Sequence, residues 1–234
     1  MMSCHGPSKR SQQGFTLVEL MISSVIGLLL TSAMLAAFVA SARTYQLQDA
    51  MSEVQENGRF ALGVLLKDLR QSGVGSSSDE TVLGVENTAK TVEDFETEYG
   101  NLVITQSDIQ SEIIYLPGLD TTYYVGDTGV GRPSLYRKDQ PLVEGVEGLV
   151  FEYGVDSDDD DDLVDVYKLL ADMSPTDDWA DVITVRFSLL VSSSGSGVTD
   201  QSQVLVSPFA DVDTSDRRLY QVYTATAMLR NAVL

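Results

Sequence analysis

The sequence predicts an α+β protein in which one long N-terminal helix packs on an antiparallel β-sheet head. Three observations support this fold class. An uncharged apolar run extends from Leu20 to Ala42, an amphipathic helical pattern continues beyond it, and the chain from Ser76 onward consists of β-rich segments separated by Gly, Pro and Asp turns. With 234 residues, 43% of them hydrophobic, the chain is long enough to build a buried core.

The negative charge of the chain is concentrated in its C-terminal part. The formal net charge is -20, and residues 74–234 alone sum to -21. A nucleic-acid-binding surface needs basic groups that displace counterions from phosphates, so we expect no nucleic-acid partner. The single cysteine and the single histidine are Cys4 and His5. One cysteine cannot form an internal disulfide framework.

The run from Leu20 to Ala42 predicts a membrane-spanning helix. Its 23 residues would extend about 35 Å, which is enough to cross a hydrocarbon core of about 30 Å. Lys9 and Arg10 precede the run, and the positive-inside tendency then leaves the N-terminus in the cytoplasm and the chain after Ala42 outside. A cleaved signal peptide usually has a shorter apolar region, although Ala40-Ser41-Ala42 resembles a leader-peptidase site.

A carboxylate, Glu19, lies at the edge of this apolar run. A charge near hydrocarbon is costly enough that it is usually retained for a partner or a function. No Lys, Arg or His lies between Ser11 and Ala42 to neutralise it. Its partner must therefore come from chemistry that the unprocessed chain does not show.

The segment around Glu19 resembles a known processing motif. Gly14-Phe15-Thr16-Leu17-Val18-Glu19-Leu20, after a short basic leader, resembles the class III signal of type IV prepilins and type II secretion pseudopilins. The resemblance implies that a prepilin peptidase cuts between Gly14 and Phe15 and methylates the new N-terminus. It also implies that Glu19 meets the N-terminal amine of a neighbouring subunit in a filament, an ion pair that helps only when both charges arrive together.

Cleavage after Gly14 would remove Cys4 and His5. The mature chain from Phe15 to Leu234 would then hold neither residue type, which excludes Cys nucleophiles, Ser–His pairs and the common His or Cys zinc sites. The chain also lacks the G-x-S-x-G and G-x-x-x-x-G-K-[ST] motifs. We therefore expect no enzymatic activity and no required cofactor.

The helix is expected to continue well beyond the membrane. Apolar residues recur at spacings of three and four as far as Leu69, and the pattern stops near Gly73. This predicts a helix from Phe15 to Gln71 whose outer half covers the head. Gly58 and Gly63 each weaken such a helix by about 1 kcal/mol relative to alanine, which predicts a bend or close packing at these positions.

Three further segments narrow the resemblance to PilW-type minor pilins: Gln55 to Gly73, LVEGVEGLVFEYGVD at 142–156, and MLRN at 228–231. The resemblance implies a single-pass protein of the bacterial inner membrane, with its head in the periplasm, that is incorporated into a pilus at the cell surface. Its partners would be the prepilin peptidase and, through the N-terminal helix, other minor and major pilins. Its role would be pilus assembly or priming, in support of adhesion or twitching motility.

Two alternatives stay open at this point. A type II secretion pseudopilin of the J type shares the stem chemistry and also carries a large head. A secreted acidic binding domain, released by leader peptidase, would begin at Arg43. On the preferred interpretation the chain divides into a leader (1–14), a transmembrane and filament-core helix (15–42), an amphipathic extension (43–72) and an acidic antiparallel-sheet head (73–234).

The head is predicted to consist of strands and turns. Segments 73–98 and 192–202 have loop composition, and we expect them to be mobile. The predicted strands are Leu102 to Thr105, Glu112 to Leu116, Thr122 to Val125, Ser134 to Arg137, Gly148 to Val155, Val182 to Val191, Gln203 to Val206 and Leu219 to Leu229.

An acidic run in the head carries the remaining chemistry. A looping chain can turn alternate side chains onto one hard Ca²⁺ ion, and the residues with that spacing are Asp156, Asp158, Asp160 and Asp162. An EF-hand would need Gly at the sixth position and Glu at the twelfth, where this chain has Asp161 and Tyr167. The loop from Asp156 to Asp165 is therefore either a Ca²⁺ site of another type or a solvated acidic loop that gathers counter-cations.

Overall fold

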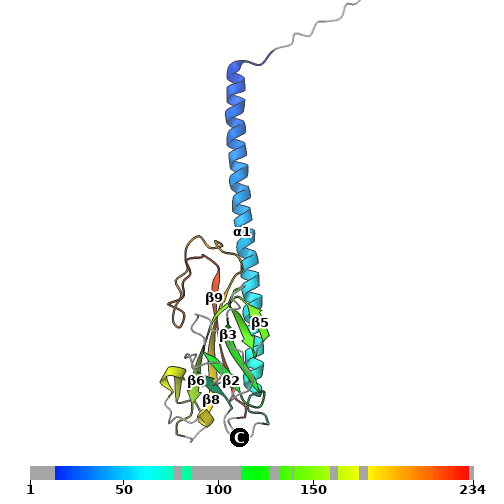
Figure 1. The fold of residues 1–234 in the computed structure, drawn as a ribbon. Helices are drawn as coiled ribbons and strands as arrows, with labels where there is room; N and C mark the ends of the chain where they lie inside the picture. Colours follow the sequence, from blue (N-terminus) through cyan, green and yellow to red (C-terminus); the bar gives the residue numbers. More distant parts are fainter. Residues whose placement is uncertain are drawn as a thin grey trace, which may run out of the picture. The chain divides into compact units, whose positions relative to one another are not determined.

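The computed structural model describes residues 14–75, 81–85, 112–126, 132–138, 140–158, 163–173 and 179–231. In these residues one helix is followed by strands and two short 3-10 turns, which confirms the α+β class (Figure 1). The elements are α1 (Leu17–Gln71), β1 (Leu83–Val85), β2 (Ile113–Leu116), β3 (Thr121–Gly126), β4 (Ser134–Arg137), β5 (Gln140–Glu144), β6 (Val146–Val155), β7 (Val166–Leu169), η1 (Leu170–Asp172), η2 (Trp179–Asp181), β8 (Val182–Ser192) and β9 (Tyr220–Met228).

The chain divides into two compact units, Met1–Tyr45 and Gln46–Leu234, and α1 contributes residues to both. Among the described residues, every buried side chain belongs to the second unit, in which the first is Ala50. The second unit therefore has a hydrophobic core of its own. We expect residues 46–234 to fold without the first unit.

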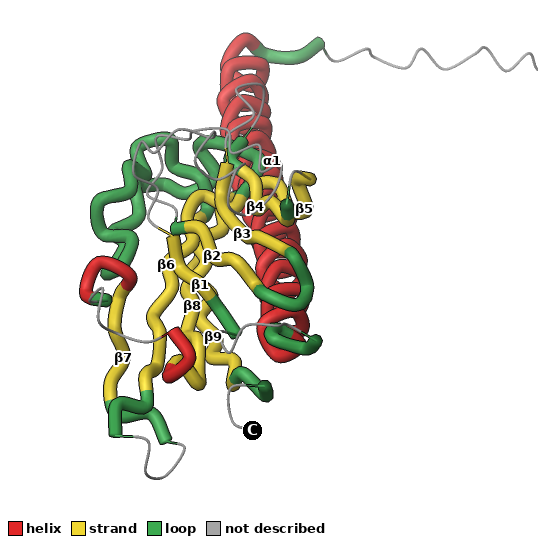
Figure 2. Tube along the Cα trace, turned by 60° about the horizontal axis from the view of Figure 1, so that its bottom comes forward, coloured by secondary structure: helices red, strands yellow, loops and turns green. Residues whose placement is uncertain are grey.

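The described residues of the head form two antiparallel sheets where the sequence suggested one. A five-stranded sheet has the order β1-β2-β3-β4-β5, and a four-stranded sheet has the order β7-β6-β8-β9 (Figure 2). The chain passes from one sheet to the other at Gly145, whose φ of 82° favours glycine. A Cβ at this position would also lie 2.8 Å from the carbonyl oxygen of Ser192.

The core is built from α1 and from both sheets. The second half of α1 buries a stripe at spacings of three, four and seven residues that includes Val54, Ala61, Leu65 and Leu69. Leu47 and Met51 continue the same apolar spacing toward the N-terminus but are more than a third exposed. The apolar stripe therefore begins to meet the head at Ala50, slightly later than the sequence pattern indicated.

The predicted strands at 112–116, 122–125, 134–137, 148–155, 182–191 and 219–229 are confirmed as β2, β3, β4, β6, β8 and β9. The predicted strand from Gln203 to Val206 was wrong, because this segment pairs with no strand in the described structure. The predicted strand from Leu102 to Thr105 lies outside the described residues. The sequence did not predict β1, β5 and β7, which have three, five and four residues.

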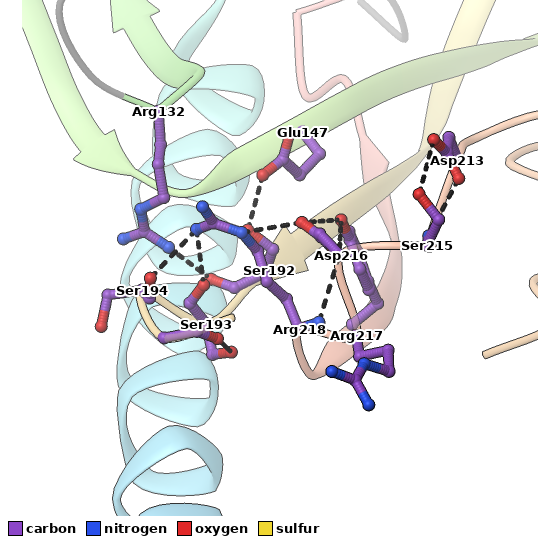
Figure 3. A network of polar contacts seen from close by, with 12 residues as sticks. Arg132, Glu147, Ser192, Ser193, Ser194, Asp213, Ser215, Asp216, Arg217 and Arg218 are labelled. Atoms are coloured by element: carbon purple, nitrogen blue, oxygen red, sulfur yellow. Dashed lines mark hydrogen bonds and ion pairs between the residues drawn. The ribbon is translucent and has the colours of Figure 1, made fainter. Parts of the chain in front are cut away.

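The segment 192–202 is held by hydrogen bonds, in contrast to the mobility expected from its composition. The Glu53 carboxylate on α1 accepts hydrogen bonds from the Ser194 backbone N–H at 3.0 Å and from its Oγ at 2.8 Å. Arg218 Nη1 donates to the carbonyl oxygens of Ser193 and Ser194, both at 3.1 Å (Figure 3). Serine-rich composition therefore supplies hydrogen-bond donors here rather than a flexible linker.

Glu53 also forms an ion pair with Arg132, which donates a hydrogen bond to the same segment. Arg132 Nη2 lies 3.1 Å from Glu53 Oε1, and Arg132 Nη1 donates to the Ser192 carbonyl oxygen at 3.0 Å. Burial acts to raise the pKa of the Glu53 carboxyl, but the hydrogen bonds from Ser194 and the charge of Arg132 outweigh burial and lower that pKa. The contribution of this carboxylate to stability is present above its unfolded pKa and is lost as the pH falls through its folded pKa.

Gly58 and Gly63 occupy different environments on α1. A Cβ at Gly58 would lie 2.3 Å from Cε2 of Tyr223 on β9, whereas a Cβ at Gly63 would meet no atom of the described residues within 4 Å. The Tyr223 hydroxyl donates a hydrogen bond to the Val54 carbonyl oxygen at 3.1 Å, which fixes the ring against the helix. The predicted close packing is therefore confirmed at Gly58 and absent at Gly63.

The two glycines should respond to alanine in opposite directions. In residues 46–234, Gly63→Ala should raise the free energy of unfolding by about 1 kcal/mol through helix propensity. Gly58→Ala gains the same propensity but must displace the Tyr223 ring, so it should lower the free energy of unfolding by about 1–2 kcal/mol net. Urea denaturation of both variants measures this difference, and equal stabilisation by both would contradict the packing described for Gly58.

Candidate assembly segment and acidic loop

The N-terminal segment places its motif residues at the start of α1. Gly14 and Phe15 precede the helix, and Phe15 is 84% exposed. Thr16 stands at the N-cap position, and its Oγ1 accepts a hydrogen bond from the Glu19 backbone N–H at 3.2 Å. The Thr16 hydroxyl also lies 3.5 Å from Glu19 Oε2 as a donor. This is half of a capping box, a local role that the pattern T-x-x-E could have indicated from the sequence.

The apolar residues that follow are not covered by the described parts of the chain. Every residue from 15 to 41 is exposed. Among the described residues, α1 is the helix that is long and apolar enough to cross a membrane, and none of its most apolar stretch is buried. A core helix of a soluble protein would be mostly buried. An exposed apolar surface of this length is typical of a segment that lies in lipid or against other subunits.

Hydroxyl side chains within this segment donate hydrogen bonds to the backbone of the helix itself. Four hydroxyl groups donate to a carbonyl oxygen three or four residues earlier, at 2.7–2.9 Å; they belong to Ser23, Ser24, Thr31 and Ser32. Such hydroxyls need no water and are compatible with lipid. Glu19 is then the one charged side chain in residues 15–42.

The acidic loop lies in the hairpin that joins β6 to β7. Asp156, Asp158 and Asp165 each offer a carboxylate oxygen, and these oxygens lie within 4.8 Å of one another. Of the predicted ligands, the structure therefore brings Asp156 and Asp158 together, while Asp160 and Asp162 lie outside the described residues. Asp165 joins them because the antiparallel pairing of β6 with β7 returns the chain to its starting point, as the Asp165 N–H to Val155 carbonyl bond at 3.0 Å shows.

Ser157 holds the Asp165 carboxylate in this loop. The Ser157 Oγ donates to Asp165 Oδ2 at 2.7 Å and its backbone N–H donates at 2.9 Å. These hydrogen bonds lower the pKa of the Asp165 carboxyl. The three carboxylates are hard oxygen ligands of the type that Ca²⁺ prefers, so the loop has a donor set that could bind this ion.

Comparisons with known proteins give matches in two parts of the chain. Residues 9–35 are similar to the prokaryotic N-terminal methylation motif, and residues 122–231 are similar to the family described as type IV pilus-assembly protein W. A solved type IV-like pilin from Thermus thermophilus is similar at 13% identity and a TM-score of 0.39, with 77% of this chain and 98% of that chain covered. No curated protein matches this chain.

The two matched regions coincide with the two parts described above. The methylation motif includes Gly14, Phe15, Glu19 and most of the exposed apolar helix. The second match runs from β3 through β9 and includes the acidic loop.

Proposed function

Because the chain is, by its matches to these two families, a type IV pilus minor pilin of the PilW type, we propose that it is processed between Gly14 and Phe15 and takes part in pilus assembly or priming. The observation that supports this most directly is the exposed apolar helix directly after the cleavage motif, with Glu19 as its one charged side chain. An exposed apolar helix can exchange lipid for the helices of other pilins without a change in its own fold.

The proposed assembly step depends on a charge that cleavage creates. Cleavage after Gly14 gives Phe15 a free α-amino group, and this amine is a cation that the unprocessed chain lacks. In the apolar interior of a filament, a carboxylate such as Glu19 is costly unless a cation accompanies it. We infer that the amine of a neighbouring subunit supplies that cation, so that only a correctly placed, processed subunit completes the pair.

The topology proposed for the membrane stage follows from the flanking charges. Lys9 and Arg10 precede the apolar segment, and Arg43 is the one basic residue within the 15 residues that follow it. The positive-inside tendency then favours a cytoplasmic N-terminus and a periplasmic head in the inner membrane before incorporation into a pilus at the cell surface. The role we infer for the head is structural rather than catalytic, in support of pilus-dependent adhesion or motility.

The proposed function is tested by the location of the protein in cells that make it. We expect the processed chain in filaments sheared from the cell surface, in addition to the inner membrane. A type II secretion pseudopilin would leave the sheared fraction empty and would impair protein secretion when its gene is deleted. Deletion should instead reduce the number of surface pili. Sheared filaments that lack the protein, together with unchanged piliation in the deletion strain, would contradict the proposal.

A separate proposal concerns the acidic loop, for which we propose Ca²⁺ binding by Asp156, Asp158 and Asp165, with Asp160 and Asp162 as further candidates. The support is the approach of three carboxylate oxygens within 4.8 Å, since like charges this close repel unless a cation neutralises them. Titration of residues 46–234 with Ca²⁺ should release or absorb heat and raise the melting temperature. Asp165→Asn should weaken both effects, and the absence of any heat at millimolar Ca²⁺ would end this proposal.

A further inference from the structure

Strand β9 forms one edge of the four-stranded sheet, because it pairs with β8 and with no other strand in the described structure. We propose that this edge is a self-association surface, on which a second copy of the chain adds its own β9 in antiparallel orientation. The two four-stranded sheets would then form one continuous sheet across a two-fold axis. The proposal goes beyond the assembly function and does not depend on it, since all of its residues lie in the head.

The register of the sheet identifies the backbone groups that face this edge. The Leu229 N–H donates to the Ile183 carbonyl oxygen at 2.9 Å, so this pair is a hydrogen-bonded pair of the β8–β9 ladder. In an antiparallel ladder such pairs alternate with pairs whose N–H and C=O groups point away from the partner. The residues of β9 whose backbone groups point to the free edge are therefore Tyr220, Val222, Thr224, Thr226 and Met228.

The backbone groups of Tyr220, the first of these residues, are hydrogen-bonded to the side chain of Gln203. The Tyr220 N–H donates to Gln203 Oε1 at 2.7 Å, and Gln203 Nε2 donates to the Tyr220 carbonyl oxygen at 3.2 Å. The amide of Gln203 thus occupies the place that the peptide group of a paired strand would take. It also ends the free edge at Tyr220, so an added strand can pair from Val222 to Met228.

The other sheet edges in the described structure carry the features that prevent strand addition. On β5, Pro141 lacks an N–H, Asn57 Nδ2 donates to the Glu144 carbonyl oxygen at 3.2 Å, and the pairing with β4 is irregular. Strands β1 and β7 have three and four residues, and β7 includes Lys168. By contrast, β9 has nine residues with no proline, no charge and no register shift. Natural proteins rarely leave a long edge unprotected in this way unless it pairs.

The exposed edge is complementary to itself. A two-fold axis through Ala225 would place Thr224 opposite Thr226 of the second copy and Val222 opposite Met228 of the second copy. Threonine pairs and apolar pairs are both favourable across antiparallel strands. Met228 is 52% exposed in one copy and would be covered by this pairing. Gln203 limits the pairing to Val222 through Met228, and the register centred on that stretch also places threonine opposite threonine and an apolar residue opposite an apolar residue.

The charge of the strand supports a second copy as the occupant. Residues 220–231 contain no acidic side chain and one basic side chain, Arg230, in a chain whose net charge is -20. Two copies can therefore meet at this strand without direct contact between acidic groups. The remaining acidic surfaces repel each other through solvent, and salt screens this repulsion. Self-association should accordingly strengthen as the ionic strength rises.

A disulfide at the two-fold axis tests the pairing most specifically. The one natural cysteine is Cys4, so the test uses the full chain in detergent with Cys4→Ser and, in parallel, residues 46–234. In the proposed register Ala225 faces Ala225 of the second copy as a close non-hydrogen-bonded pair, about 4.5 Å between Cα atoms. Ala225→Cys should form a covalent dimer under mild oxidation. In this register Gln221 lies far from Gln221 of the second copy, so Gln221→Cys should not form a covalent dimer.

A backbone variant tests the hydrogen bonds themselves. Thr224→Pro removes an N–H that faces the free edge and leaves the β8–β9 ladder intact, so the dissociation constant measured by sedimentation should rise at least tenfold. Thr224→Val loses the same hydroxyl contact with Ser188 but keeps the N–H, and it should still dimerise. A monomeric wild type at high salt, equal cross-linking of Ala225→Cys and Gln221→Cys, or unchanged dimerisation of a folded Thr224→Pro would each overturn the proposal. If Thr224→Pro fails to fold, the two cysteine variants decide alone.

Discussion

Replacing Asp68 by alanine should lower the free energy of unfolding of residues 46–234 by about 2–4 kcal/mol, because it leaves a buried hydroxyl without an acceptor and a cation without its partner. Asp68 lies on α1, and its side chain is 8% exposed. The Tyr123 hydroxyl on β3 donates to Asp68 Oδ2 at 2.8 Å, and Arg137 Nε on β4 donates to the same oxygen at 2.9 Å. These three residues connect the helix to the five-stranded sheet.

The two partners of Asp68 should contribute unequally to this loss. The Arg137 side chain is 40% exposed and can recover hydration, whereas Tyr123 is fully buried and cannot. Burial, followed by the hydrogen bond to Asp68, raises the pKa of Tyr123 well above its ordinary value, so its hydroxyl remains a donor at any physiological pH. Most of the predicted destabilisation therefore comes from the Tyr123 hydroxyl, which still accepts a hydrogen bond from Arg137 Nε at 3.2 Å but loses the acceptor for its own proton.

An exposed ion pair gives the matched control for this variant. Glu152 and Arg186 lie 3.3 Å apart with 37% of each side chain exposed, and Glu152→Ala should cost less than about 1 kcal/mol. Removing the stranded hydroxyl should also restore stability, so Asp68→Ala combined with Tyr123→Phe should be more stable than Asp68→Ala alone. Urea denaturation measures all three. If Asp68→Ala and Glu152→Ala cost the same, Asp68 does not connect the helix to the sheet as described.

Replacing Glu19 by alanine should remove the protein from sheared pili while leaving it processed and in the inner membrane. The apolar segment inserts into lipid at least as readily without this carboxylate, because a charge near hydrocarbon is unfavourable. Assembly should fail because the amine of the neighbouring Phe15 would then enter the filament interior without an anion. Immunoblots of sheared filaments and of membranes from the same cells measure the two pools.

Glu19→Gln separates the proposed ion pair from the local capping role of Glu19. Glutamine can take the same place in a capping box, but it carries no charge. Loss of assembly in both Glu19→Ala and Glu19→Gln therefore supports the ion pair, whereas normal assembly of Glu19→Gln would reduce Glu19 to a helix cap. Ser23→Ala is the control on the next turn. The Ser23 hydroxyl donates to the Glu19 carbonyl oxygen of its own helix at 2.7 Å, so its removal should leave assembly unchanged.

The sequence pattern predicted the helix and the long strands better than the short ones. The apolar spacing of α1 ends before Gly73, and the helix ends at Gln71 as predicted. Strand β8 begins with four β-branched residues in a row, Val182 to Val185, and β6 is rich in Val, Phe and Tyr, which are residue types that favour strands. Strand β5 contains Pro141, which argues against a strand locally, and its neighbours and α1 determine its conformation.

The division into two sheets and the fixed conformation of residues 192–202 depend on contacts between residues that are far apart in the sequence. The turn at Gly145 is stabilised by its N–H bond to the Pro133 carbonyl oxygen at 2.8 Å, and a single-sequence pattern does not contain that pairing. Ser194 meets Glu53 across 141 residues. Composition alone therefore indicated a flexible linker, although its hydroxyl and amide groups find fixed partners.

The candidate site residues could be predicted to different extents. Gly14, Phe15 and Glu19 form a local motif, so the sequence alone is sufficient to propose them, and their roles in processing and assembly stay predictions. The acidic loop was recognised from its composition, but Asp165 joins Asp156 and Asp158 through the β6–β7 hairpin. The free edge of β9 could not be recognised from the sequence, because it depends on which strands are neighbours in the sheet.

The intact mass of the protein purified from its own membrane shows whether it is processed as a minor pilin. We expect the mass of a chain that runs from Phe15 to Leu234 and carries one methyl group on its N-terminal amine. A chain beginning at Arg43 would identify a secreted domain released by leader peptidase. A chain that still carries the leader residues before Phe15 would show that the motif is not processed, and either result would contradict the assignment of this protein as a processed minor pilin.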